Sequence, residues 1–185
     1  MSRTFPTTRM AGFNIEHGRY VILGSIDGLL AVLGVVIATY TVSTDVAIIV
    51  RAGLGGGVAL ALTNGIGSYL AEGAVEYGKL CALEKLMLRS LKNTKLERRT
   101  RHKIRIDSFV HGTSSFMGSL IPLCPFLLQL RGAIYISVVA SIIALAALGL
   151  FSGYISKQGM VLSVVKMVGL GLLIVVVLGA LGFGH

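Results

Sequence analysis

The chain has 185 residues, of which 54% are hydrophobic and only 14% are charged. A soluble domain carries about 25% charged residues, so the composition excludes an ordinary soluble domain and favours a helical bundle in a lipid bilayer. The net charge of +9 does not indicate nucleic acid, because no aromatic residues are interleaved with the basic ones for base stacking. Anionic lipid headgroups are the simpler partner for this charge, unless the charge serves only to orient the protein in the membrane.

Five apolar segments follow one another along the chain, each close to the roughly 20 residues that a membrane-spanning helix needs. Short connections join most of them, which makes neighbouring helices antiparallel. We therefore predict an all-α membrane protein with a single transmembrane domain over residues 1–185. The predicted spans cover residues 20–42, 46–71, 107–130, 133–154 and 160–183.

The one long connection, residues 73–106, contains ten of the seventeen basic residues. Cytoplasmic loops of membrane proteins carry an excess of Lys and Arg, so this helical insert is predicted to be cytoplasmic. With five spans the N-terminus is then cytoplasmic as well, and the C-terminus at His185 lies on the opposite side of the membrane.

The first span contains a carboxylate, Asp27, in an otherwise apolar sequence from Tyr20 to Val42. The segment is too long for the apolar part of a signal peptide and lacks a convincing cleavage site, so it is predicted to remain as a helix. A charged carboxylate at this depth is costly and is tolerated where it meets a cation, a proton or water. Asp27 is therefore the first functional candidate.

Small residues recur every four positions in the second span and so share one face of the helix. Such a face lets helix backbones approach closely, either within the protomer or at a dimer interface. The glycines do not form a phosphate-binding P-loop, because the Lys-Ser/Thr that this loop needs is absent. The stripe consists of Gly53, Gly57, Ala61 and Gly65.

Polar residues follow on the inner part of the same span, at Thr63, Asn64 and Ser68. Glu72 and Glu76 come next, at the predicted cytoplasmic end. Carboxylates at positions i and i+4 project to one side of a helix, where they can share a hard divalent cation. The alternative is that both are solvated residues just beyond the membrane.

The long connection begins with an apolar stripe among charged residues, which is typical of an amphipathic helix. A basic stretch from Lys95 to Arg105 is predicted as a second short helix. Asp107 and His111 lie one turn apart where the third span begins. Such a pair is usually an interfacial hydrogen bond, with a metal site as the less common alternative. The apolar stripe is formed by Leu80, Leu83, Met87 and Leu91.

Four local sequences occur in order in the first four spans: Arg19-Tyr-Val-Ile-Leu-Gly-Ser-Ile-Asp-Gly-Leu-Leu, Gly67-Ser-Tyr-Leu-Ala, Phe116-Met-Gly-Ser-Leu-Ile-Pro-Leu-Cys-Pro-Phe126 and Leu150-Phe-Ser-Gly153. Together they resemble the vacuolar iron transporter family, over nearly all of residues 16–183. The resemblance implies a five-span homodimer that exports ferrous iron, or manganese, from the cytoplasm in exchange for protons.

The resemblance also assigns candidate ligands. In that family the first-span Asp, here Asp27, lines the translocation path near the dimer axis. The second span typically supplies a Met, which is Asn64 here, and many members have a Glu where this chain has Ser68. Both departures remove a ligand and leave a neutral polar group, whose oxygen suits hard ions such as Mn²⁺ or Mg²⁺ better than a thioether does.

The insert departs from the family as well. Members with a ferritin-like domain have a longer, Glu-rich insert, whereas this one is short and basic. Glu72, Glu76 and Glu84 lie where the family's first insert helix carries carboxylates, so they form a candidate for a reduced metal-recruiting site.

We therefore expect a transporter of Fe²⁺ or Mn²⁺, in which Asp27 from two protomers binds the ion and takes up a proton when the ion leaves. The second hypothesis is a non-transporting membrane scaffold that binds anionic lipid or a partner through its basic helices. An enzyme is not expected, because no nucleophile–base pair or cofactor motif is visible, and the metal would be cargo rather than a cofactor. The candidate metal ligands are Asp27, Asn64, Ser68, Glu72, Glu76 and Glu84.

The predicted topology can be tested by cysteine-accessibility labelling in sealed vesicles. Single cysteines in residues 73–106 and near the N-terminus should react from the cytoplasmic side, and a cysteine at His185 from the other side, because the basic insert fixes the orientation. Labelling of His185 and the 73–106 segment from the same side would contradict five spans.

Overall fold

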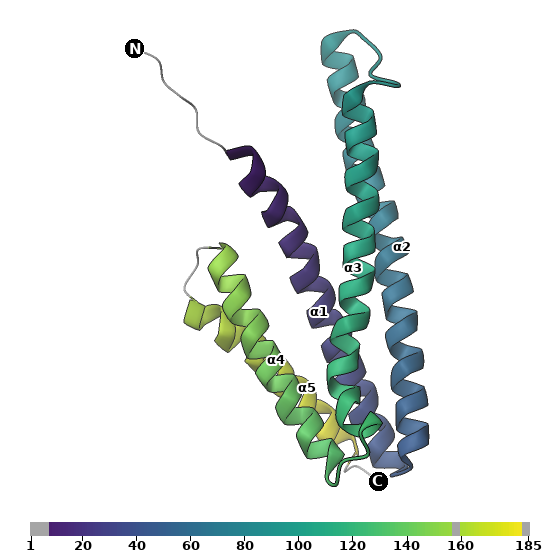
Figure 1. Ribbon diagram of the computed structural model, residues 1–185, viewed down its shortest axis with the longest axis vertical. Helices are drawn as coiled ribbons and strands as arrows, with labels where there is room; N and C mark the ends of the chain where they lie inside the picture. The colour runs from purple at the N-terminus through teal and green to yellow at the C-terminus, as the bar shows by residue number, and fades with distance from the viewer. Residues whose placement is uncertain (1–7, 157–159, 183–185) are drawn as a thin grey trace.

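The computed structural model describes residues 8–156 and 160–182, which form five α-helices and, within these ranges, no strand (Figure 1). This result confirms the predicted all-α class. The helices are α1 (Thr8–Val42), α2 (Val46–Met87), α3 (Lys95–Leu127), α4 (Ala133–Ser156) and α5 (Met160–Gly182).

The third helix is the centre of the arrangement, because α3 packs against both α1 and α2 along much of its length (Figure 1). Helices α4 and α5 pair with each other and lie against α1. In the described part of the chain, α2 contacts neither α4 nor α5. The first three helices thus form a unit, with one side of the α1–α2 pair left uncovered by the last two helices.

Helices α2 and α3 extend beyond the other helices as a hairpin, whose tip is at the top of Figure 1. α2 ends before Leu88, which adopts a left-handed conformation with φ 51°, and α3 begins after Thr94, whose hydroxyl accepts the backbone N–H of Glu97. The Glu97 carboxylate accepts the backbone N–H of Asn93 at 2.6 Å, and this hydrogen bond lowers the pKa of Glu97. Reciprocal capping of this kind fixes where a helix starts. The short helix expected over Lys95–Arg105 is therefore the first part of α3 and not a separate element.

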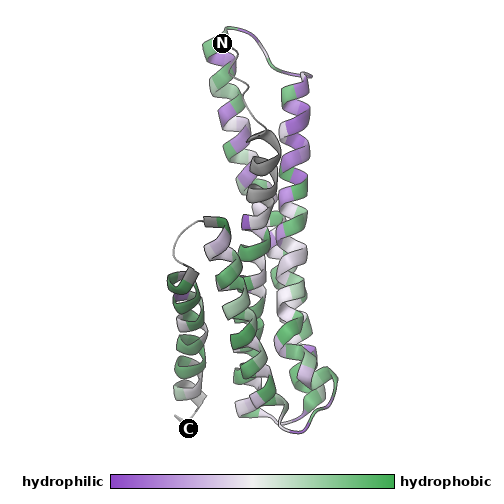
Figure 2. Cartoon of the chain, turned by 60° about the vertical axis from the view of Figure 1, so that its left-hand side comes forward, coloured by the Kyte–Doolittle hydropathy of each residue, from purple (hydrophilic) through white to green (hydrophobic). Residues whose placement is uncertain are grey.

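Within the described residues, three helices are long and apolar enough to cross a membrane, namely α1 from Gly18, α2, and α4 up to Ile155. α5 has a shorter apolar stretch, Val161–Val177. Hydrophilic residues gather at the tip of the α2–α3 hairpin, and apolar residues dominate the opposite part of the bundle (Figure 2). α3 is less apolar than its neighbours because it carries buried polar residues, so five membrane crossings stay a prediction. These buried residues are Asp107, Ser108, His111, Ser114, Ser115 and Ser119.

Glycines allow α3 to lie very close to both neighbouring helices. A methyl group at Gly28 of α1 would overlap the backbone carbonyl of Ser115, and one at Gly118 of α3 would lie 2.9 Å from the Cα atom of Ser25. On the α2 side, a methyl group at Gly112 would lie 2.8 Å from the carbonyl oxygen of Ala61. Backbone atoms cannot rotate out of the way, so any larger residue would push the helices apart.

The small-residue stripe of α2 faces α3. A methyl group at Gly57 would lie 3.0 Å from the Cβ atom of Ser119, and one at Gly65 would lie 3.7 Å from the Cα atom of Gly112. Gly53 packs against the side chain of Leu123. Of the two roles considered for the stripe, packing within the protomer is the one the structure shows.

Replacement of Gly118 by alanine should destabilise the bundle by about 1–3 kcal/mol, the usual cost of inserting an extra methyl group into a well-packed core. The variant should therefore unfold at a lower temperature in detergent. Gly55→Ala is the matched control, since a methyl group there meets nothing within 4 Å and alanine favours a helix by about 1 kcal/mol. Equal melting temperatures for the two variants would show that the α1–α3 contact can relax.

Candidate functional site

Helices α2 and α3 present polar faces to each other. Polar residues recur every four positions on each helix, so each set shares one helix face. Because the two helices are antiparallel, each step of four along α2 is matched by a step of four back along α3. We call these two sets of polar residues, together with Tyr20 and Asp27 of α1, the polar column. Its members on α2 are Asn64, Ser68, Glu72 and Glu76, and on α3 they are Lys103, Asp107, His111 and Ser115.

Asp27 lies at the inner end of this column. At a rise of about 1.5 Å per residue, it is about 14 Å along α1 from Gly18 and about 22 Å from Val42, which are the ends of the apolar segment. The Asn64 amide donates to the Asp27 carboxylate at 3.4 Å and to the Ser115 hydroxyl at 2.8 Å. The Asp27 side chain is still 44% exposed, so the carboxylate sits at the edge of the bundle and is not sealed within it.

His111 lies next to Asp27 and is almost fully buried, with its side chain 9% exposed. Its Nδ1 atom is hydrogen-bonded to the hydroxyl of Ser68. Its Nε2 atom is 3.9 Å from a carboxylate oxygen of Asp27. The Tyr20 ring packs against the imidazole, with centroids 5.7 Å apart. Two of the predicted metal ligands, Asp27 and Ser68, thus lie on either side of one histidine.

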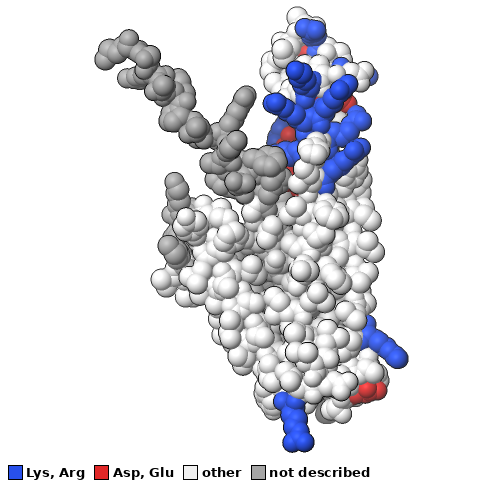
Figure 3. All heavy atoms as spheres, in the orientation of Figure 1, with Lys and Arg blue, Asp and Glu red and all other residues white. Residues whose placement is uncertain are grey.

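The outer end of the column is a cavity of about 300 Å³ between the three helices. The Tyr20 hydroxyl donates to the Glu72 carboxylate on one side of it. On the other side, Glu76 is paired with Lys79 at 2.8 Å and with Lys103 at 3.6 Å. Figure 3 shows that Lys and Arg gather over this end of the molecule and are sparse over the bundle below. The cavity lining includes Arg19, Tyr20, Glu72, Glu76, Lys79, Lys103 and Asp107.

Two residues singled out in the sequence, the polar Thr63 and the candidate ligand Glu84, lie outside the column. The Thr63 side chain is exposed, and its hydroxyl donates to the carbonyl of Ala59 in its own helix at 2.9 Å. Glu84 lies near the end of α2, where its carboxylate accepts the backbone N–H of Leu91 at 2.6 Å and the hydroxyl of Ser90 at 3.2 Å. In this structure Glu84 therefore holds the hairpin turn together and is not near Glu72 and Glu76.

The donor set of the column is small. Among the described residues, no three His, Cys, Asp or Glu side chains converge as they would at a preformed metal centre. A larger cavity of about 580 Å³ lies between α2 and α3, but its lining has no carboxylate or imidazole and includes Leu62, Phe109, Phe116 and Met117. The residues able to meet an ion deep in the bundle are thus Asp27, His111 and the neutral groups around them.

Sequence reasoning missed Tyr20 and Ser115 as members of the column and gave His111 a different partner. Tyr20 lies seven residues before Asp27, a spacing that places both on one side of α1. Ser115 follows His111 by one turn on α3. His111 was expected to pair with Asp107, but the structure places it against Ser68 and Asp27, because the adjacent helices bring those groups closer.

Comparison with known proteins places the chain in a family. A family model described as the VIT family matches residues 79–183. The chain belongs to the VIT family, the vacuolar iron transporters. It is also similar to an uncharacterized protein of Methanocaldococcus jannaschii, with 38% identity over 160 residues that cover 84% of this chain and 83% of the relative. Membership of the VIT family and the apolar helices make this chain an integral membrane protein of a transporter family and not an enzyme family.

Replacement of both Glu72 and Glu76 by glutamine should weaken the binding of divalent ions, because the cavity at the outer end of the column loses two negative charges and little packing. Titration with Mn²⁺, with free ion followed by electron paramagnetic resonance, measures the change. Glu97→Gln is the matched control, since Glu97 lies in the first turn of α3 and not in the cavity lining, and glutamine can also cap the helix. An unchanged titration of the double variant would mean that the pair does not bind divalent ions.

Proposed function

We propose that this VIT family member moves Fe²⁺ or Mn²⁺ out of the cytoplasm in exchange for protons, and that it works as a homodimer. The observation that supports this proposal most directly is the position of Asp27, a carboxylate near the middle of an apolar helix. In the described part of the chain, no lysine or arginine forms an ion pair with it. Its negative charge is therefore available to a transported cation.

The cost of placing a carboxylate at this depth gives the exchange a physical basis. Ionised Asp27 is stabilised when a divalent cation is bound, and when the ion leaves, a proton removes the remaining charge. A site that alternates between these two ligands couples the movement of one to the movement of the other.

The polar column supplies a route from the outer cavity to this carboxylate. A divalent ion at the cavity first meets Glu72 and Glu76, which lie within one helix turn of each other. Ser68 and Asn64 follow on the same face of α2, so water or side-chain oxygens can replace the ion's hydration shell in steps. The predicted orientation makes the outer cavity the cytoplasmic one.

The proposed dimer follows from the small donor set and the partly exposed Asp27. One protomer offers a single carboxylate at this depth, while hard and borderline divalent ions prefer several oxygen or nitrogen ligands. A second protomer that packs on the uncovered side of α1 and α2 would bring a second Asp27 to the same ion. The resemblance to the vacuolar iron transporters implies the same arrangement.

A scaffold function is the competing proposal, and the exposed basic surface of the hairpin favours it (Figure 3). That hypothesis needs the basic residues and does not need Asp27. The transport hypothesis predicts the reverse, so one set of variants can separate the two.

Asp27→Asn should abolish ion flux in proteoliposomes while the purified protein keeps its oligomeric state and melting temperature. Asparagine preserves the shape and can still bond to Asn64, but it cannot carry the charge. Flux of Fe²⁺ and Mn²⁺ and the accompanying pH change report the activity.

The control for this experiment replaces Arg98, Arg101 and Arg105, which lie together on the hairpin, by glutamine. This triple variant should transport like the parent. Normal flux in Asp27→Asn would refute the role given to Asp27. No flux in the parent protein, with loss of binding to anionic vesicles in the triple variant, would refute transport and support the scaffold.

A further inference from the structure

We propose that His111 is a nitrogen ligand of the ion held at Asp27, so that the site prefers transition metals to Mg²⁺ and Ca²⁺. This inference rests on the proposed transport function. It adds to the candidate ligands a residue for which the sequence offered a metal role, beside Asp107, only as the less common alternative, and which the family resemblance did not assign. The argument uses the burial of the imidazole, the position of its two nitrogens and the chemistry of the groups around it.

The imidazole is aimed at the carboxylate but is not bonded to it. Nε2 has no hydrogen-bond partner among the described residues, although the side chain is only 9% exposed. Buried polar atoms in folded proteins are nearly always paired, so an unpaired nitrogen at this depth needs a reason. Its separation of 3.9 Å from the Asp27 oxygen is too long for a hydrogen bond.

The same separation suits a shared metal ion. Bonds of about 2.1 Å from one tetrahedral ion to an imidazole nitrogen and a carboxylate oxygen place these two atoms about 3.4 Å apart. A side-chain movement of about half an ångström, within the range of small rotamer adjustments, would bring Nε2 and the Asp27 oxygen to the separation of two ligands of one ion.

Ser68 fixes the other nitrogen of the ring. A metal-bound histidine usually donates its remaining N–H to an oxygen, which sets the tautomer and the ring orientation. The Ser68 hydroxyl is in hydrogen-bond contact with Nδ1 of His111. When Nδ1 donates to Ser68, Nε2 carries a lone pair that points toward Asp27.

The surroundings limit other orientations of the ring. The ring of Tyr20 packs on one side of the imidazole. On another side Gly24 lies so close that a methyl group there would be 3.0 Å from the His111 Cδ2 atom. The imidazole is thus held in place by groups on two neighbouring helices, α1 and α2.

This ligand changes the expected ion preference. Carboxylate, amide and hydroxyl oxygens alone favour hard ions such as Mg²⁺ and Mn²⁺, whereas imidazole suits Fe²⁺, Co²⁺ and Zn²⁺. The loss of a thioether at Asn64 is therefore offset by a nitrogen at His111. The site becomes one of mixed nitrogen and oxygen ligands.

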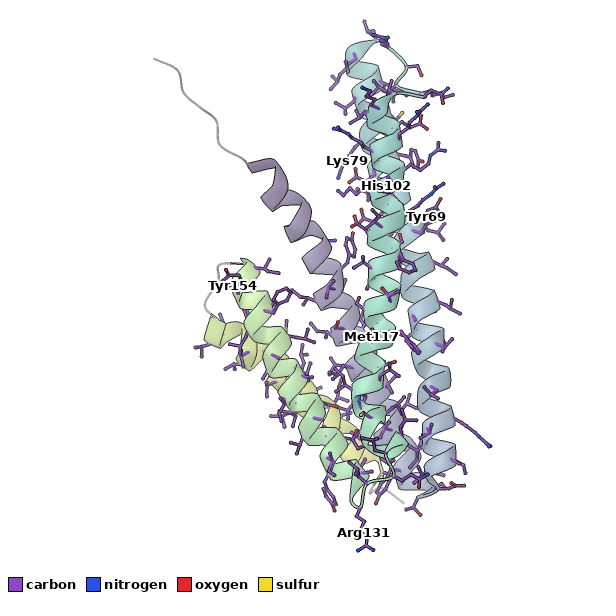
Figure 4. All side chains as sticks on the ribbon, in the orientation of Figure 1. Tyr69, Lys79, His102, Met117, Arg131 and Tyr154 are labelled. Atoms are coloured by element: carbon purple, nitrogen blue, oxygen red, sulfur yellow. The ribbon has the colours of Figure 1, made fainter. Side chains whose placement is uncertain are left out.

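The test uses Co²⁺ as the probe, with the full-length protein purified in detergent without a polyhistidine tag. His111→Gln should lower the Co²⁺ affinity by about tenfold or more and leave the weak Mg²⁺ affinity unchanged. The imidazole signal in the X-ray absorption spectrum of bound Co²⁺ should disappear. His102→Gln is the matched control on the same helix, because His102 lies exposed on the hairpin, above Met117 in Figure 4. It should change neither quantity.

A second variant keeps the test decisive if His111→Gln assembles poorly. Ser68→Ala retains the imidazole but removes the group that holds Nδ1, and it should lower the Co²⁺ affinity by about tenfold. Parent-like Co²⁺ binding and an unchanged spectrum in His111→Gln would overturn the assignment, as would parent-like affinity in Ser68→Ala. These are the results expected if the imidazole only forms an ion pair with Asp27 and does not contact the metal.

Flux assays separate this inference from the transport proposal. If the parent protein transports metal and His111→Gln keeps the same preference among Fe²⁺, Mn²⁺ and Mg²⁺, the ligand assignment is wrong and transport stands. If the parent binds Co²⁺ through imidazole but moves no ion, the transport proposal is wrong and the ligand assignment stands.

Discussion

The close approach of three helix backbones is the constraint on which the rest of this structure depends. In lipid, apolar side chains gain little by leaving the surrounding hydrocarbon, so helices associate through tight packing and hydrogen bonds between small and polar residues. Gly28, Gly112 and Gly118 bring α1 and α2 into backbone contact with α3. Only at this separation can short side chains such as Ser68 and Ser115 reach groups on a neighbouring helix.

The number of charged side chains along the polar column decreases from its outer end to its inner end. Around the outer cavity, carboxylates are balanced by Arg19, Lys79 and Lys103. Farther in, the groups on α2 are neutral, and Asp27 holds the remaining negative charge. A lysine ammonium paired with Glu76 occupies the position that an incoming cation would take, so an ion that binds there must displace a cation already attached to the protein. The deeper carboxylate has no such competitor in the described residues.

The helical content and the inner carboxylate could be predicted from sequence, because apolar segments and a buried charge are local signals. That Asn64, Ser68, Glu72 and Glu76 share one helix face could also be predicted, since it depends only on the period of the helix. The pairing between α2 and α3 could not be predicted, because it depends on how tightly residues 88–94 turn and on which glycines meet. For this reason the partners of His111 and the role of Glu84 became visible only in the structure, while the orientation in the membrane and the dimer stay predictions.

The matched four-residue intervals of α2 and α3 have a mechanical consequence. If α3 slid along α2 by one helical turn, about 5.4 Å, most polar groups of the column would again face a polar group, with His111 opposite Glu72 in place of Ser68. Only Lys103 would come to lie opposite an apolar residue, Leu80. Hydrogen bonds alone therefore discriminate weakly between the two alignments. The glycine contacts discriminate strongly, because Gly112 would leave the backbone of Ala61 and a larger residue would take its place. The hairpin turn tied by Glu84 opposes the same slippage, so residues outside the bundle help to decide which side chains meet inside it.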